Sequence, residues 1–285
     1  MSFTNQIKTV VLLGLLTALL LWVGNLIGGI QGLTVAIIFV VIMNFVSYWF
    51  SDKIVLMMYR AKPVKESEQP ELYKIVKEIA KSANIPVPKL YVIDAQYNNA
   101  FATGRSKNHA AVAVTKGIMN LLTKDELKGV IAHEISHIKN KDILIQTVAA
   151  TIAGIISYVA MMVRYAAIFG GGNRDRNGNS GLELLILAII TPIIATLIQL
   201  AISRSREYFA DESGAKLLKT GSGLASALEK LESSAKRQPL KASSLSNATA
   251  HLFILNPFRG EGFLTLFSTH PPVSIRIKKL NSLRF

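Results

Sequence analysis

The chain contains no cysteine among its 285 residues, which excludes disulfide bonds and metal sites built from thiolates. It also contains no Asp, Glu, Lys, Arg or His between Thr9 and Ser51. Because an α-helix rises about 1.5 Å per residue, this uncharged run could reach roughly 64 Å, twice the thickness of a bilayer's hydrocarbon core. Glycines from Gly24 to Gly32 divide the run. We therefore predict two membrane spans joined by a tight turn.

A cleaved signal peptide is the alternative interpretation of the N-terminus. Such a peptide has a shorter apolar region, followed by a cleavage site with small residues and then by polar chain. Here a second apolar stretch follows the first. The sequence therefore favours two spans.

Two further uncharged stretches are long enough to cross a membrane. Ile143–Val163 has 21 residues, and Leu184–Ser203 has 20 residues with Pro192 in its middle. A pair of buried core helices is the alternative, but the length and the lack of a polar face favour spans. We expect four spans arranged in two hairpins.

Acidic residues are scarce, with 18 Asp and Glu against 32 Lys and Arg, and the net charge is +14. No nucleic-acid-binding motif accompanies this charge, so we expect no nucleic-acid partner and assign the charge to solvated and membrane-facing surface. Basic residues flank the predicted spans mainly on the side of the two chain ends, so the positive-inside rule predicts cytosolic termini. The flanking residues on that side are Lys8, Lys53, Arg60, Lys62, Lys65, Lys139, Lys141, Arg204 and Arg206.

The predicted spans divide the chain into hairpins at 1–51 and 143–203 and soluble segments at 52–142 and 204–285. Each soluble segment is small for an independent core, so we expect one cytosolic domain of about 170 residues built from both. We predict an α-helical membrane protein with a mainly α, α+β cytosolic domain that carries a small sheet. Hydrophobic periodicity and turn signals predict helices at 70–84, from Thr123, at 206–219, at 224–235 and after Pro272, and strands at 90–95, 100–104 and 110–115.

The sequence HEISH at 133–137 is typical of a helix that binds zinc. Residues four apart lie on one helical face, so His133 and His137 can hold one ion. Glu134 would then lie beside the open coordination position, where it can take a proton from water and pass it to a leaving amine. The alternative is a polar helix face with two incidental histidines.

A catalytic zinc with two histidines needs a third protein ligand. The two ends of a membrane hairpin meet at one surface, so the segment after the fourth predicted span lies near HEISH. There Glu207 and Asp211 are four residues apart on one predicted helix. Glu207 could bind the metal while Asp211 orients a ligand histidine. Alternatively, both carboxylates face solvent and pair with Arg204 or Lys216.

Four separated motifs resemble the HtpX family of bacterial membrane zinc proteases, which are relatives of the CAAX-prenyl proteases: HEISH, SRSREYFADESGA at 203–215, NNAFATG at 98–104 and STHPPVSIRI at 268–277. The resemblance implies a zincin-like (gluzincin) fold with one zinc ion per chain. It implies His133, His137 and Glu207 as ligands, Glu134 as general base and Asp211 as the partner of a ligand. It also implies that Asn99 and His270 lie near the scissile carbonyl. Without the resemblance, the sequence alone would suggest that His270 lies in the N-cap region of a helix, ahead of Pro271-Pro272.

The resemblance further implies a zinc endopeptidase (EC 3.4.24 type) of the bacterial cytoplasmic membrane, with its site on the cytosolic face. Its substrates would be membrane or membrane-associated proteins, bound as extended strands, and its role would be quality control and stress response. Three alternatives differ in their requirements. A prenyl-protein protease needs more spans, a zinc-dependent scaffold does not need Glu134, and an intramembrane protease carries its motif inside a span. The sequence leaves the role of Arg276, the substrates and the oligomeric state open.

Overall fold

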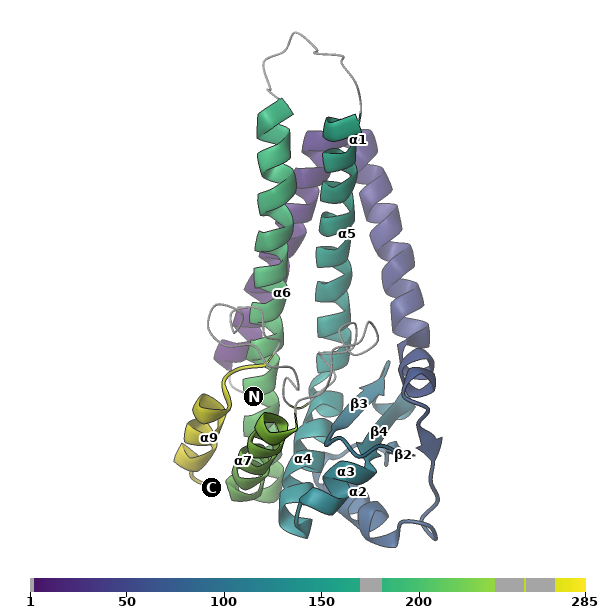
Figure 1. Ribbon diagram of the computed structural model, residues 1–285, viewed down its shortest axis with the longest axis vertical. Helices are drawn as coiled ribbons and strands as arrows, with labels where there is room; N and C mark the ends of the chain where they lie inside the picture. Colours follow the sequence, from purple (N-terminus) through teal and green to yellow (C-terminus); the bar gives the residue numbers. More distant parts are fainter. Residues whose placement is uncertain (1–2, 170–180, 239–253, 255–269) are drawn as a thin grey trace.

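The computed structural model describes residues 3–169, 181–238, 254 and 270–285. Long helices rise from one end of a domain that contains shorter helices and a small sheet (Figure 1). Residues 170–180 of the predicted loop between the third and fourth spans, and most of the polar loop predicted at 236–249, lie outside the described residues.

Helix α1 (Phe3–Met58) is helical throughout its 56 residues. The predicted tight turn at the glycines is therefore not a loop. The trace of α1 nevertheless turns back on itself far from the domain, so that both of its ends lie on the domain side (Figure 1). Glycine has no Cβ to resist bending, which permits a change of direction without a separate turn segment.

Helices α5 (Asp142–Phe169) and α6 (Gly181–Leu218) form a second pair of long helices. The fourth predicted span and the helix predicted at 206–219 are parts of α6, because no helix-breaking residue separates them. Pro192 lies within α6, where the hydroxyls of Thr191 and Thr196 donate to the carbonyls of Leu187 and Pro192.

Two helices in the described part of the chain are long and apolar enough to cross a membrane, at Asp142–Arg164 and Ile186–Leu218. They overlap the third and fourth predicted spans. The described residues of α1 contribute a shorter apolar helix, Gly14–Val23. Leu16 and Leu20 of this segment pack with Ile156 of α5 and Ile202 of α6. The arrangement of four spans stays a prediction.

The sheet has four strands in the order β1-β2-β4-β3. Their bounds are β1 (Lys62–Pro63), β2 (Lys89–Ile93), β3 (Ala100–Gly104) and β4 (Ala110–Thr115). β2 and β4 are parallel, while β1 pairs with β2 and β3 pairs with β4 in antiparallel register. β3 therefore lies at one edge of the sheet, as the family resemblance implies for the strand that follows Asn99.

The helix that carries HEISH lies at the centre of the domain core. This helix, α4 (Lys124–Asn140), begins with a complete capping box between Thr123 and Glu126, as predicted. Its apolar side chains pack with the sheet and with helices from both soluble segments in one core. In the described part of the chain, the domain also contains α2 (Pro70–Ala83), η1 (Lys107–His109), α3 (Lys116–Leu121), α7 (Ser222–Arg237) and α9 (Val273–Ser282).

Glu126 fastens the start of α4 to α7. Its carboxylate accepts hydrogen bonds from Ser226 Oγ at 2.6 Å and from Lys230 Nζ at 2.8 Å. Burial alone would raise the pKa of Glu126, but these two bonds and those from Thr123 lower it to about 2. Since the folded pKa lies below the usual ~4.3 of the unfolded chain, the stabilisation is complete above about pH 5 and is lost as the pH falls toward 2.

We expect Glu126→Gln to lower the free energy of unfolding by about 1–3 kcal/mol at pH 7, because it removes charge-assisted hydrogen bonds. Thermal melts of the full chain in detergent should show this difference at pH 7 and a smaller one near pH 3. Glu71→Gln is the control, since Glu71 is 74% exposed and pairs only with Lys124 on the surface. Parallel pH profiles for wild type and Glu126→Gln would contradict the assignment.

Candidate metal centre

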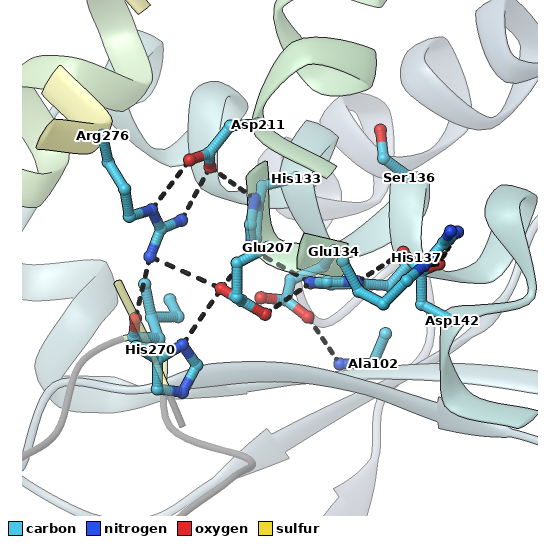
Figure 2. Close-up of polar contacts among 12 residues, drawn as sticks. Ala102, His133, Glu134, Ser136, His137, Asp142, Glu207, Asp211, His270 and Arg276 are labelled. Carbon is cyan, nitrogen blue, oxygen red and sulfur yellow. Dashed lines mark hydrogen bonds and ion pairs between the residues drawn. The ribbon is translucent and has the colours of Figure 1, made fainter. Parts of the chain in front are cut away.

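Three side chains from two helices converge in the domain interior. His133 and His137 extend from α4, and Glu207 extends from α6, with one donor atom from each within 4.8 Å of the others. Nε2 of His137 lies 3.1 Å from Nε2 of His133 and 3.3 Å from Oε1 of Glu207. Nε2 of His133 lies 3.6 Å from Oε2 of Glu207. Glu207 points between the two imidazoles (Figure 2).

These separations fit a tetrahedral ion. Two donor atoms bound at 2.0–2.1 Å to a tetrahedral Zn²⁺ lie about 3.3 Å apart. The three measured donor separations range from 3.1 to 3.6 Å. Two imidazoles and one carboxylate are also a ligand set that catalytic zinc sites use, with the fourth position left open. The residues present therefore fit zinc.

The close approach of α6 to α4 depends on a small residue. A Cβ atom at Gly214 of α6 would lie 3.0 Å from the backbone of Ala132 and His133. A side chain there would push the helices apart at the turn that carries the first histidine. Gly214 thus permits the separation at which Glu207 meets the histidines of α4.

A carboxylate holds the second ring nitrogen of each histidine (Figure 2). Nδ1 of His133 lies 2.9 Å from Oδ1 of Asp211, at ion-pair distance but without the alignment of a hydrogen bond. Nδ1 of His137 makes a hydrogen bond of 2.9 Å to Oδ2 of Asp142. Partners of this kind fix the ring orientation and leave Nε2 for the metal.

The two histidines have raised pKa values in this surrounding. Burial lowers the pKa of His137, but the contacts with Asp142 and Glu207 raise it well above its usual value. For His133, Asp211 and Glu207 likewise outweigh the effect of burial. The negative charge that would attract a metal cation also favours protons, so a proton and a metal ion compete for the same ring nitrogens.

Arg276, whose role the sequence left open, lies in the site and is completely buried. Its guanidinium donates to Asp211 through Nε at 2.8 Å and through a terminal nitrogen at 2.7 Å. The other terminal nitrogen lies 3.5 Å from Glu207 Oε2 and donates to the carbonyl of Ile254 at 3.2 Å. Burial lowers the pKa of Arg276, but Asp211 and Glu207 raise it above its usual value, so the group stays charged.

Glu134 lies beside the histidines and is buried. Its Oε2 accepts a hydrogen bond of 2.8 Å from the backbone N–H of Ala102 in β3 (Figure 2). Burial raises the pKa of Glu134, while the nearby His133 and His137 oppose this shift. A general base with a raised pKa holds a proton more readily, which suits a group that takes and returns one.

The structure places Asn99 directly before β3, and the side chain is buried. Its Oδ1 accepts a hydrogen bond of 3.2 Å from the backbone N–H of Ile254. Its backbone N–H and carbonyl both bond to the Thr115 hydroxyl at 3.0 Å. The amide nitrogen is therefore the end of this side chain that could donate to a substrate, and the predicted role of Asn99 stays a prediction.

His270 contacts the third candidate ligand. Its Nδ1 lies 3.0 Å from Oε2 of Glu207. The imidazole is thus part of the centre, and this contact would orient Glu207 in addition to any contact with substrate. Neither Arg204 nor Lys216 pairs with Glu207 in the described part of the chain; Lys216 instead contacts Glu212 at 2.6 Å.

Sequence reasoning missed Asp142 and Arg206. Arg206 was counted among the solvated basic residues that flank the spans, but it is buried and paired with Asp142. One sequence signal could have found this pair. The argument that brings the two ends of the hairpin together to deliver Glu207 also brings Asp142, at the start of one arm, to Arg206, at the end of the other.

Comparisons with known proteins agree with the motifs. Residues 66–284 match the model of peptidase family M48. A protease HtpX homolog of Syntrophobacter fumaroxidans is 49% identical over 98% of this chain and 99% of its own length. The Desulfatibacillum aliphaticivorans homolog is 53% identical over 98% of this chain and 90% of its own length. The Pyrococcus furiosus homolog is 52% identical over 97% of this chain and 95% of its own length.

The crystal structure of S. mikatae Ste24p aligns with a TM-score of 0.58 over 98% of this chain and 66% of that protein. At 19% identity this likeness shows the fold alone, and the chain spans just under two thirds of the Ste24p length. The family match and the relatives at 49 to 53% identity carry the assignment and confirm the resemblance seen in the motifs. The chain belongs to peptidase family M48 and, within it, to the HtpX proteases.

Proposed function

We propose that the chain is a zinc-dependent endopeptidase that cuts membrane or membrane-associated polypeptides at the cytosolic face of the cytoplasmic membrane. The convergence of His133, His137 and Glu207 beside a buried Glu134 carries this proposal. Zinc held by the three ligands would polarise the scissile carbonyl and lower the pKa of the attacking water. A binding site without chemistry would not need the carboxylate of Glu134.

Glu134 would act as the general base. Its carboxylate takes the proton of the attacking water and delivers it to the amine that leaves. The Ala102 N–H holds Oε2 at 2.8 Å, which fixes the side chain on the β3 side of the centre. Asn99 and His270 would donate to the oxygen that becomes negative at the scissile carbon.

The substrate would bind as an extended strand along β3. β3 is the last strand in the sheet order, and among the described residues β4 is its pairing partner. Its backbone reaches the centre through Ala102, whose N–H meets Glu134. A peptide added to this edge would be held by main-chain hydrogen bonds, which favours extended chain over folded protein. Unfolded segments of damaged membrane proteins fit this requirement, which supports a role in quality control.

Exposed apolar surface on the long helices supports a membrane location. Ile189 and Ile193 of α6 are 52% and 46% exposed, and Tyr158 of α5 is 51% exposed. Large apolar side chains that face outward along a helix of this length suit a lipid surrounding. The basic residues that flank the predicted spans on the domain side support a cytosolic domain.

Sealed membrane vesicles test the metal requirement and the orientation together. We expect inverted vesicles, whose cytosolic face is outward, to cleave an added unfolded polypeptide. Right-side-out vesicles should cleave it only after detergent is added. A chelator should abolish cleavage, and added zinc should restore it. Cleavage that resists the chelator would overturn the metalloprotease, whereas equal cleavage by intact vesicles of both orientations would overturn only the cytosolic site.

A further inference from the structure

The chain passes from the metal-binding helix into the first long helix of the α5/α6 pair through a single residue. α4 ends at Asn140, and Lys141 adopts the left-handed conformation with φ of 59°. α5 then begins at Asp142, whose side chain is almost completely buried. Because the helix is interrupted at Lys141, Asp142 at the start of α5 lies beside the last turn of α4.

Asp142 contacts two groups of different function. One carboxylate oxygen, Oδ2, lies 2.9 Å from Nδ1 of His137. The other, Oδ1, accepts a hydrogen bond from Nε of Arg206 and forms an ion pair with one of its terminal nitrogens. With Nδ1 occupied, the remaining nitrogen of His137 is Nε2, and this is the atom that faces His133 and Glu207.

Arg206 ties the same junction to α6. It directly precedes Glu207 in sequence, is buried, and its guanidinium lies 4.8 Å from the centre of the Phe209 ring. It also donates to the carbonyl of Asn140 at 3.4 Å, a weak bond at the end of α4. Arg206, which lies on the α6 arm, therefore contacts both the end of α4 and the start of the α5 arm.

The arrangement has a counterpart around His133. There Asp211 lies against the ring, and the buried Arg276 neutralises Asp211. Each histidine thus has a carboxylate behind it and a buried guanidinium behind the carboxylate. The two carboxylate–guanidinium pairs differ in the helices that they connect. The Asp142–Arg206 pair connects α5 to α6, whereas the Asp211–Arg276 pair connects α6 to α9.

We propose that Asp142 and Arg206 are positioning residues that fix His137 for metal binding and thereby couple the geometry of the metal centre to the base of the α5/α6 hairpin. The proposal rests on the proposed metal site. A displacement of α5 against α6 would move Asp142 relative to Arg206 and rotate the His137 ring. The hairpin in the membrane would in this way influence whether the three donor atoms can meet one ion.

Asp142→Asn tests the proposal in the purified full chain. Loss of a partner behind a ligand histidine typically weakens metal binding about 10–100-fold. We expect a zinc dissociation constant raised by this factor in competition with a chelator, and shifted visible absorption bands in the cobalt-substituted protein. Arg206→Gln should have a similar effect, and the double variant should be no weaker than the weaker single variant, because the two residues act as one unit.

Glu212→Gln is the control, because Glu212 lies on α6 but pairs with Lys216 at the surface. It should leave the zinc affinity and the cobalt spectrum unchanged. If Asp142→Asn does not fold, Asp142→Glu decides the question, since it keeps the charge but displaces the carboxylate by one methylene. A shifted cobalt spectrum in this variant supports positioning.

A folded Asp142→Asn, or in its place Asp142→Glu, with wild-type zinc affinity and cobalt spectrum would overturn the inference. Additive effects of Asp142→Asn and Arg206→Gln would overturn the coupling to the hairpin. A wild-type chain that binds no zinc would instead overturn the proposed function. The failure of the inference is thus distinguishable from the failure of the site on which it rests.

Discussion

Glu134→Gln should leave zinc bound and reduce peptide hydrolysis by a factor on the order of 10²–10⁴, which is the usual contribution of a general base. The amide has nearly the shape of the carboxylate and can still accept the hydrogen bond that Ala102 donates to Glu134. It cannot take a proton from water at neutral pH. The variant therefore removes the chemistry and keeps the packing. The measurement is cleavage of an unfolded polypeptide at equal protein and zinc concentrations, together with the zinc content.

Asp125→Asn is the matched control for this variant. Asp125 lies on α4 as well, in its first turn, and is exposed. Both substitutions exchange a carboxylate for an amide on the same helix, so only the position relative to the metal centre differs. Activity of Glu134→Gln within a few-fold of wild type would contradict the role of Glu134. Loss of zinc together with activity would point to a structural role.

Local features of the metal centre were predictable from the sequence because they lie within one helix. The spacing of His133 and His137 places both on one face of α4, and the capping box at Thr123 marks where that helix begins. Both depend on residues three or four apart, where helical geometry leaves little freedom. The strands β2, β3 and β4 were predictable for a similar reason, since short apolar runs alternate with polar turns.

Contacts that depend on the packing of segments distant in sequence were harder to predict from the sequence. Glu207 could be brought to the histidines by the argument that hairpin ends meet, but spacing alone left it open. The contact of His270 with Glu207 spans 63 residues of sequence, and the bond from Ile254 to Asn99 spans 155. No periodicity encodes such contacts. The prediction of two spans joined by a turn also missed that α1 stays helical through the glycines, because glycines predict a change of direction without saying whether the helix continues through it.

The Asp142 contact shows the limit most clearly. Its partner His137 is only five residues away, yet the contact requires the left-handed conformation at Lys141. A lysine gives little indication of this conformation, which glycine or asparagine would have indicated. The sequence pattern therefore did not single out Asp142 as a contact of the metal centre. In the structure, Asp142 connects that centre to α5.

Glu207→Ala should weaken zinc binding more than about 100-fold, beyond the 10–100-fold typical of a partner behind a ligand, because it removes one of three protein donors. Of the three ligands found among the described residues, His133 and His137 would then remain to hold the ion. The second expected result is a loss of activity that excess zinc partly restores, since Glu134 and the β3 edge stay in place. Zinc content after dialysis against a chelator of known affinity measures the first effect, and a zinc titration of activity measures the second.

Two comparisons separate the donor role of Glu207 from its other contacts. Glu207 also contacts His270 and Arg276, so Glu207→Ala leaves a void and removes these partners. Glu207→Gln keeps the volume and one weakly coordinating oxygen, so its affinity should lie between those of wild type and alanine. Glu212→Gln, at a half-buried position of α6 that pairs with Lys216, should retain full zinc. Wild-type zinc retention by a folded Glu207→Ala would remove Glu207 from the ligand set. We expect the zinc affinity to decrease from wild type to Glu207→Gln to Glu207→Ala only if the carboxylate itself binds the metal. If Glu207 contributed packing alone, the zinc affinity of Glu207→Gln would equal that of wild type.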